Sequence, residues 1–210
     1  MIVWINGAFG GGKTHTAHEI HRRLPGSVIC DPEFAGFGLN RMIPRALRGD
    51  FQDLPVWRTS VHHVLDMVAS RTDGVVLVPM TLVSPRYFSE IVGRLRSDGH
   101  EVRHFSLLAP REVVLRRLSE RVFGHAFQLL RGGRITPRRE SWAARKVDLC
   151  LSQLRKPEFA EHIWNDKTPL PAVADKIASS CGLTLTPNTD SALRAQLRRA
   201  TVGIKHIRLD

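Results

Sequence analysis

The first twenty residues hold a glycine-rich stretch that ends in a lysine and a threonine. The segment from Gly7 to Thr14 reads GAFGGGKT and has the spacing G-x-x-x-x-G-K-[ST]. Glycines at this spacing let successive backbone N–H groups turn inward around phosphate oxygens, and the lysine that follows reaches the outer phosphates. The hydroxyl after the lysine can hold Mg²⁺. The pattern therefore predicts a phosphate loop that binds ATP with Mg²⁺, with Thr14 as the metal ligand.

The flanking residues place this stretch where a phosphate loop must lie. An apolar run at residues 2–6 predicts a strand, and Ala17, Ile20 and Leu24 then recur at helical spacing until Pro25 and Gly26 end the pattern. The alternative is a tight turn between a strand and a helix. The predicted nucleotide-binding residues are Gly7, Ala8, Phe9, Gly10, Gly11, Gly12, Lys13, Thr14, Thr16 and Asn165.

A carboxylate that could act in catalysis follows the second predicted strand. Residues 75–84 read VVLVPMTLVS and contain no acid, which counts against a motor ATPase. Asp31 ends the second strand, and the carboxyl ends of parallel strands lie at the edge where ligands of such sheets bind. Asp31 could accept a proton from a substrate hydroxyl or hold the waters of a metal ion. The alternative is a turn aspartate before Pro32.

Arginines form a second group of candidates. Arg117 and Arg121 are four residues apart on a predicted helix and therefore share one face. They precede a glycine- and arginine-rich stretch at residues 123–141 that shows no sustained period. We expect an arginine-bearing lid that neutralises phosphate charge and excludes water, with Lys13, Asp31, Arg117 and Arg121 as the catalytic residues. The alternative for the arginines is a solvated basic face. Asn165 follows the fifth strand, where a loop could pass the adenine base, although a polar turn explains it equally well.

Strands and helices alternate along the chain. Short apolar strands are predicted at residues 2–6, 27–31, 75–80, 102–108 and 161–165, with amphipathic helices between them. This alternation predicts an α/β protein with a doubly wound, parallel five-stranded sheet and a kinase-like phosphate loop. We expect a single domain over residues 1–210. Its parts are a substrate-side helical insertion at 34–72, an arginine-rich lid at 122–141 and a C-terminal amphipathic helix at 188–208.

The composition is that of an ordinary globular chain with an excess of positive charge. The 210 residues are 42% hydrophobic and 24% charged, with a net charge of +11, which favours anionic partners such as nucleotides. No apolar stretch has the roughly 18 residues that a membrane span needs. The three cysteines show no C-x-x-C spacing, which fits a reducing cytoplasm.

The C-terminal segment has an apolar stripe with basic residues beside it. The stripe consists of Leu193, Leu197, Ala200, Ile204 and Ile207. Such a helix either docks on its own domain or makes peripheral contact with an anionic membrane. The first reading gives a cytoplasmic protein, and the second gives a membrane-associated one.

The sequence resembles the bacterial tunicamycin-resistance proteins, which are allied to the nucleoside monophosphate and shikimate kinases. The resemblance rests on WINGAFGGGKT at the start of the chain, DPE at 31–33, VPMT at 78–81, IVGRLR at 91–96, SWAA at 141–144 and HIR at 206–208. It implies ATP binding and resistance to a uracil nucleoside antibiotic that carries amino-sugar and fatty-acyl parts. It does not say whether the drug is phosphorylated or only bound. The lid is longer than the resemblance leads us to expect, which leaves its arginines without an implied role.

Two functions therefore stay open. The first is a small-molecule kinase that phosphorylates a nucleoside antibiotic with ATP and Mg²⁺. The second is an ATP-dependent protein that sequesters the antibiotic without turnover. A nucleic-acid-linked ATPase is disfavoured, since the chain has no RNA- or DNA-binding module and no clustered aromatic platform.

Overall fold

The protein folds around a five-stranded parallel sheet. The computed structural model describes the backbone over residues 1–129 and 137–191 and at positions 194, 198 and 201, with side chains described outside 121–145. The strands are β1 (Ile2–Gly7), β2 (Val28–Ile29), β3 (Val76–Pro79), β4 (Val102–Leu108) and β5 (His162–Trp164). Their order is β2-β3-β1-β4-β5, and every pairing between neighbours is parallel. The predicted fold class is confirmed.

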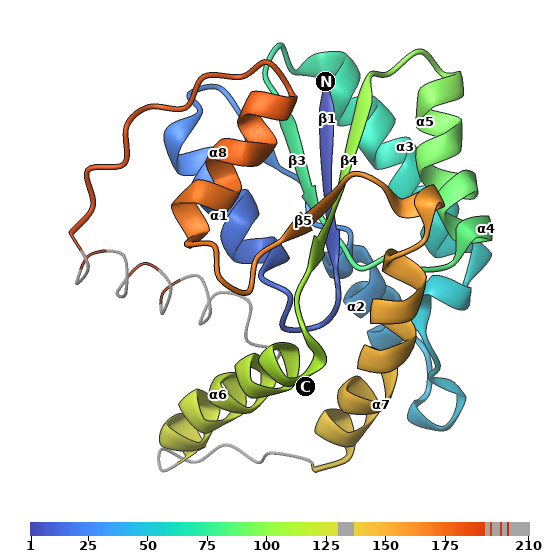
Figure 1. The fold of residues 1–210 in the computed structure, drawn as a ribbon. Helices are drawn as coiled ribbons and strands as arrows, with labels where there is room; N and C mark the ends of the chain where they lie inside the picture. The colour runs from blue at the N-terminus through green and yellow to red at the C-terminus, as the bar shows by residue number, and fades with distance from the viewer. Residues whose placement is uncertain (130–136, 192–193, 195–197, 199–200, 202–210) are drawn as a thin grey trace.

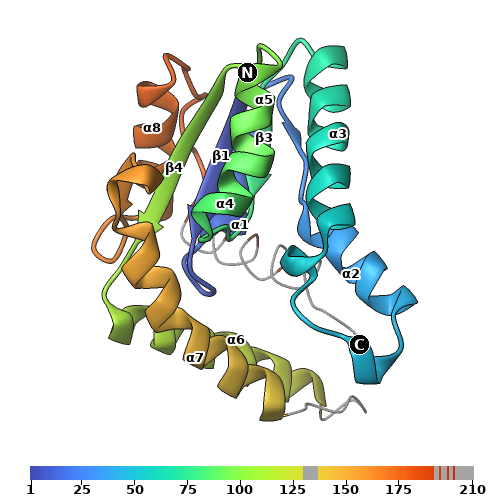
Figure 2. The same ribbon diagram turned by 90° about the vertical axis from the view of Figure 1, so that its right-hand side faces the viewer.

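Helices cover both faces of the sheet (Figure 1). They are α1 (Lys13–Arg23), α2 (Glu33–Met42), α3 (Pro55–Arg71), α4 (Pro85–Phe88), α5 (Arg94–Ser97), α6 (Arg111–Leu129), α7 (Pro137–Leu154) and α8 (Leu170–Ser180). A π-helical turn, Ser89–Gly93, joins α4 to α5. Helices α1 and α8 lie on one face, and α3 with α4 and α5 lies on the other (Figure 2). Helices α6 and α7 extend beyond the carboxyl ends of the strands.

The central strand explains this two-sided cover. All six residues of β1 are buried, and successive side chains enter opposite halves of the core. Ile2 and Trp4 pack with α3 and the helical segment after β3, whereas Val3 and Ile5 pack with α1 and α8. A strand buried on both faces reads as a continuous apolar run, which is why the sequence predicted it without alternation.

The structure differs from the predictions most clearly in the length of β2 and in the predicted lid. Strand β2 spans only Val28–Ile29, shorter than the predicted 27–31. The lid was predicted as irregular over 123–141, but α6 continues to Leu129 and α7 begins at Pro137, so only 130–136 lie outside the described residues. Glycine inside a helix costs about 1 kcal/mol relative to alanine, which a long helix tolerates. Gly124 lies within α6, and Arg138 and Arg139 lie within α7, so these residues were too weak a signal for an irregular segment.

Two other predicted parts are the insertion at 34–72 and the C-terminal helix at 188–208. The segment 34–72 contains most of α2, two 3₁₀ turns (Arg45–Leu47 and Phe51–Asp53) and α3, which packs on the sheet as the crossover to β3. The C-terminal helix at 188–208 falls mostly on residues outside those described. Among the helices that are described, none has the length and apolar character needed to span a membrane.

A buried histidine joins the two neighbouring strands β1 and β4. His104 is 4% exposed, with Nε2 at 3.2 Å from the amide nitrogen of Asn6 and Nδ1 at 2.9 Å from the carbonyl oxygen of Ala160. The neutral ring fits both contacts when Nδ1–H donates to Ala160 and Nε2 accepts from Asn6. Burial lowers the pKa of His104 from 6.5 to about 4, because the charged imidazolium loses its solvation.

This histidine predicts a loss of stability in mild acid. The unfolded chain takes up the His104 proton near pH 6.5 and the folded chain only near pH 4, so the stabilisation present above pH 6.5 declines as the pH falls between these values. From pH 7 to pH 5 the free energy of unfolding should fall by about 2 kcal/mol through this residue. Denaturant titrations of wild type and His104→Gln at both pH values measure it. An equal fall in the variant would contradict the prediction.

Candidate active site

The phosphate loop joins the end of β1 to the start of α1. Gly10 and Gly12 have φ angles of 74° and 92°, which side-chain-bearing residues rarely adopt. The N–H of Gly11 donates to the carbonyl oxygen of Ala8 at 2.9 Å, and a Cβ on Gly11 would lie 2.8 Å from that oxygen. The glycines are therefore required by the turn itself, and the turn ends at the N-terminus of α1, where backbone N–H groups favour an anion.

Lys13 is the first residue of α1 and is only 7% exposed. Its Nζ donates to the carbonyl oxygen of Ala8 at 3.1 Å, and a Cβ built on Gly7 would lie 3.2 Å from the Lys13 Cγ. Lys13 is therefore buried and packed, and not an exposed side chain of the loop. The aliphatic stem lies against the loop, while the ammonium stays at the loop's inner side.

The two threonines of α1 occupy different environments. Thr14 lies in the first turn and is partly exposed, and its role as the metal ligand stays a prediction. Thr16 is fully buried, and its hydroxyl has no hydrogen-bond partner within the described part of the chain. Over the same residues, no group of three or more His, Cys, Asp or Glu side chains could hold a metal ion. A Mg²⁺ held by one hydroxyl, phosphate oxygens and waters fits this donor set.

Asp31 follows β2 at the carboxyl edge of the sheet. Its Oδ1 accepts from the N–H of Glu33 at 2.9 Å, so the carboxylate caps the start of α2 while remaining partly exposed. The neighbouring Cys30 thiol has a raised pKa, caused first by burial and then by the charge of Asp31. The turn interpretation of Asp31 and the catalytic one are compatible, because an ionised carboxylate accepts several hydrogen bonds at once.

Arg117 and Asn165 are brought together beside the phosphate loop. The guanidinium of Arg117 donates to Asn165 Oδ1 at 3.0 Å and to the Asn165 carbonyl oxygen at 2.8 Å. The side-chain amide of Asn165 donates in turn to the carbonyl oxygen of Gly11 at 2.8 Å. Arg121 lies four residues further along α6, and its side chain is outside those described.

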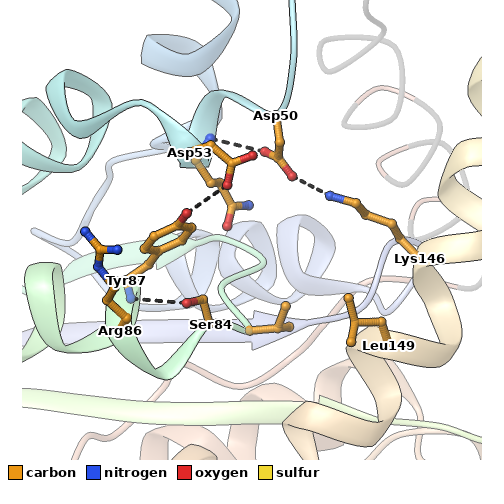
Figure 3. A pocket seen from close by; sticks show the side chains of 9 residues that line it. Asp50, Asp53, Ser84, Arg86, Tyr87, Lys146 and Leu149 are labelled. Atoms are coloured by element: carbon orange, nitrogen blue, oxygen red, sulfur yellow. Dashed lines mark hydrogen bonds and ion pairs between the residues drawn. The ribbon is translucent and has the colours of Figure 1, made fainter.

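A cavity of about 330 Å³ lies where the insertion, the segment after β3 and α7 meet (Figure 3). Across it, Lys146 Nζ on α7 is 2.5 Å from Asp50 Oδ2, and the Tyr87 hydroxyl donates to Asp53 at 2.8 Å. The other lining residues are Gln52, Val83, Ser84, Arg86 and Leu149. Three of the nine lie in the segment 34–72 that was predicted as the substrate-side insertion, but none of the nine was predicted as a site residue. They come from three distant segments, so no local pattern could have pointed to them.

Buried contacts connect this cavity to the phosphate loop. The Gln52 amide donates to the carbonyl oxygen of Thr81 at 3.0 Å, and the Thr81 hydroxyl donates to the carbonyl oxygen of Gly7 at 2.8 Å. The pKa of the Cys150 thiol on α7 is raised to about 11, first by burial, and the charges of both Lys13 and Lys146 act on it. The charges of the phosphate-loop lysine and the cavity lysine therefore both lower the pKa of this one buried thiol, against the larger effect of burial.

Comparison with known proteins agrees with this geometry. The sequence profile of a family described as "AAA domain" matches residues 2–129. The tunicamycin resistance protein of Deinococcus radiodurans is 32% identical, with a TM-score of 0.70 over 89% of this chain and 99% of that one. A sugar kinase from a Janibacter species has a TM-score of 0.56 at 18% identity over 87% of this chain and 95% of that one. Shikimate kinase from Bacteroides thetaiotaomicron has a TM-score of 0.52 at 17% identity over 87% of this chain and 99% of that one. No curated protein sequence matches the chain.

The sheet order and the glycine loop between β1 and α1 define a P-loop protein with a kinase-like fold. Since the matched profile covers more than half of the chain and one relative is 32% identical over nearly its whole length, the family is also defined. The chain belongs to the AAA-domain family, and it is a relative of the tunicamycin resistance protein of Deinococcus radiodurans.

Proposed function

We propose that the protein binds ATP with Mg²⁺ and transfers the terminal phosphoryl group to a hydroxyl of a nucleoside antibiotic of the tunicamycin type. The observation that carries this proposal is the direct connection between the phosphate loop and a polar cavity, through Gly7, Thr81 and Gln52. A kinase needs its acceptor beside the phosphate site, and a purely structural glycine turn does not. The name of the Deinococcus relative supports the choice of antibiotic.

Three residues of this chain have roles in the proposed reaction. ATP supplies the phosphoryl group, and Mg²⁺ supplies positive charge to its phosphates. Lys13 and the N-terminus of α1 bind the phosphates, and the Thr14 hydroxyl holds the metal. The oxygen of the acceptor hydroxyl bonds to phosphorus while its proton moves to Asp31. The bond between phosphorus and the leaving ADP oxygen breaks in the same step. A cytoplasmic location agrees with the proposed use of ATP and with the three free cysteines, since thiols stay reduced in a reducing compartment.

The cavity supports a polar acceptor. Its charged side chains have partners, since Asp50 pairs with Lys146, Arg86 pairs with Glu90, and Asp53 accepts a hydrogen bond from Tyr87. Hydroxyl and amide groups of a nucleoside or sugar can bond to such side chains without adding net charge to the site.

The second candidate function is ATP-dependent binding of the antibiotic without turnover. The observation that favours it is the ion pair between Asp50 and Lys146, which joins the insertion to α7 across the cavity. A pair in this position could hold a bound molecule in a closed state. The kinase remains our first proposal, because Asp31 lies at the same edge of the sheet as the phosphate loop.

Incubation of tunicamycin with the protein and ATP, followed by mass spectrometry, distinguishes the two functions. A kinase gives a mass gain of one phosphate and an equal amount of ADP, and the product should be absent with Asp31→Asn at short times. Unchanged antibiotic that co-purifies with the protein only when ATP is present would support sequestration. Unchanged antibiotic that does not co-purify would contradict both functions.

A further inference from the structure

Asn165 makes an unusual number of contacts for a residue at the end of an outer strand. It is 6% exposed, and its backbone N–H donates to the carbonyl oxygen of Leu108 at 2.9 Å. Its side-chain amide donates to Gly11 at 2.8 Å, while its two oxygens accept the two bonds from Arg117. The residue therefore contacts the end of β4, the phosphate loop and α6 at once.

Arg117 holds its side of this bridge in a fixed orientation. The guanidinium spans the side-chain oxygen and the carbonyl oxygen of one residue, a forked contact that a lysine ammonium does not reproduce. The pKa of Arg117 is lowered, first by burial and then by Arg116. Its neighbour Arg116 is exposed and forms an ion pair with Glu120 on its own helix, at 3.8 Å. The forked contact distinguishes Arg117 from an ordinary basic residue of a helix surface.

The phosphate loop also packs directly on α6. A Cβ built on Gly10 would lie 3.0 Å from Leu118 Cγ and 3.1 Å from the carbonyl oxygen of Val114. Ala8 packs in the same apolar cluster as Val114. The loop is therefore held to α6 by packing at Gly10 and by hydrogen bonds through Asn165 at Gly11, and the two attachments are adjacent in sequence.

We propose that Asn165 is a positioning residue that couples the phosphate loop to α6 through Arg117. It fixes the direction of the Gly11 carbonyl, and with it the direction of the Gly12 N–H in the same peptide plane. The position of the helix that leads into the 122–141 segment then affects how well the loop binds phosphate. This inference rests on the proposed nucleotide binding, which it deepens.

Two variants interrupt the bridge at different points. Asn165→Leu keeps the approximate shape and the backbone carbonyl that accepts from Arg117, but it removes the side-chain bonds to Gly11 and Arg117. Arg117→Lys keeps the charge but removes the fork. Each should weaken ATP binding by about tenfold in calorimetry, since each removes buried hydrogen bonds. The double variant should bind no more weakly than Asn165→Leu alone, because both changes break one bridge. Asn188→Leu and Arg116→Lys are matched controls on exposed residues and should bind as the wild type does.

Hydrogen exchange of the nucleotide-free protein separates positioning from direct contact with the ligand. Arg117→Lys should speed exchange of the amides in residues 8–14, which Arg117 does not touch, and the control variants should not. Unchanged exchange in this segment, or additive losses in the double variant, would overturn the inference. The inference would also be overturned if Asn165→Leu or Arg117→Lys had a lower melting temperature but bound ATP normally at temperatures where the variant is folded. If the wild type itself binds no ATP, the proposed function fails first, and the binding titration alone reveals it.

Discussion

Lys13→Ala is expected to lower ATP affinity by about tenfold to a hundredfold and phosphoryl transfer by a factor on the order of 10² to 10³. The ammonium is the charged donor of the phosphate loop and lies beside the Ala8 carbonyl, where it can move to a phosphate oxygen without leaving the loop. Calorimetric titration with ATP measures the first effect and a coupled ADP assay the second. Unchanged ATP affinity in the folded variant would refute the phosphate-loop interpretation.

The burial of Lys13 requires a second variant. Because the residue is only 7% exposed, alanine also removes packing against Gly7, and a loss of binding could follow from a distorted loop. Lys13→Met keeps most of the stem and removes only the charge. Both variants should lose ATP binding to the same extent, and their circular dichroism spectra should match that of the wild type. Normal ATP binding by Lys13→Met would show that packing, and not charge, is the contribution of this residue.

Asp31→Asn should lower phosphoryl transfer by a factor on the order of 10² to 10⁴ while ATP and antibiotic affinities stay within a few-fold of wild type. An asparagine oxygen can still accept from the Glu33 N–H, so the start of α2 is preserved, but the amide cannot take a proton from a hydroxyl. Single-turnover measurements of phosphate transfer, with calorimetry for both ligands, test this separation of turnover from binding.

Titrations of ATP with and without Mg²⁺ distinguish a role of Asp31 in metal binding from its proposed role as a base. If its carboxylate organises metal-bound waters, the variant loses ATP affinity only when the metal is present. Asp31→Ala is the matched comparison, because it also removes the cap of α2 and should lower the melting temperature. A folded Asp31→Asn protein with normal turnover and normal metal-dependent binding would leave Asp31 as a turn residue.

The phosphate loop could be predicted because its determinants are local. Eight consecutive residues contain the glycines, Lys13 and Thr14, and the flanking strand and helix have clear apolar patterns. The orientation of Lys13 could not be predicted, since its burial results from a loop that folds back over the stem. Local spacing establishes which residues meet a phosphate, but not how deeply each one is buried.

The cavity illustrates the opposite case. Asp50, Tyr87 and Lys146 come from segments that are separated by dozens of residues and meet only when α7 returns to the carboxyl edge of the sheet. Asn165 was predicted near the nucleotide from its place after β5, yet the bond to Gly11 depends on the approach of two loops. The glycines and arginines of the lid suggested an irregular segment, but helix formers among them extend α6 and α7.

The position of β1 in the middle of the sheet gives the two halves of the site different resistance to local unfolding. The phosphate loop is attached to a strand with every residue buried and a paired neighbour on each side, so exposing it requires the whole sheet to open. The cavity lies at the rim, where Leu47 and Met42 of the insertion are largely exposed. Partial opening of that rim leaves the sheet intact, so the proposed acceptor can be exchanged while the phosphate loop stays folded.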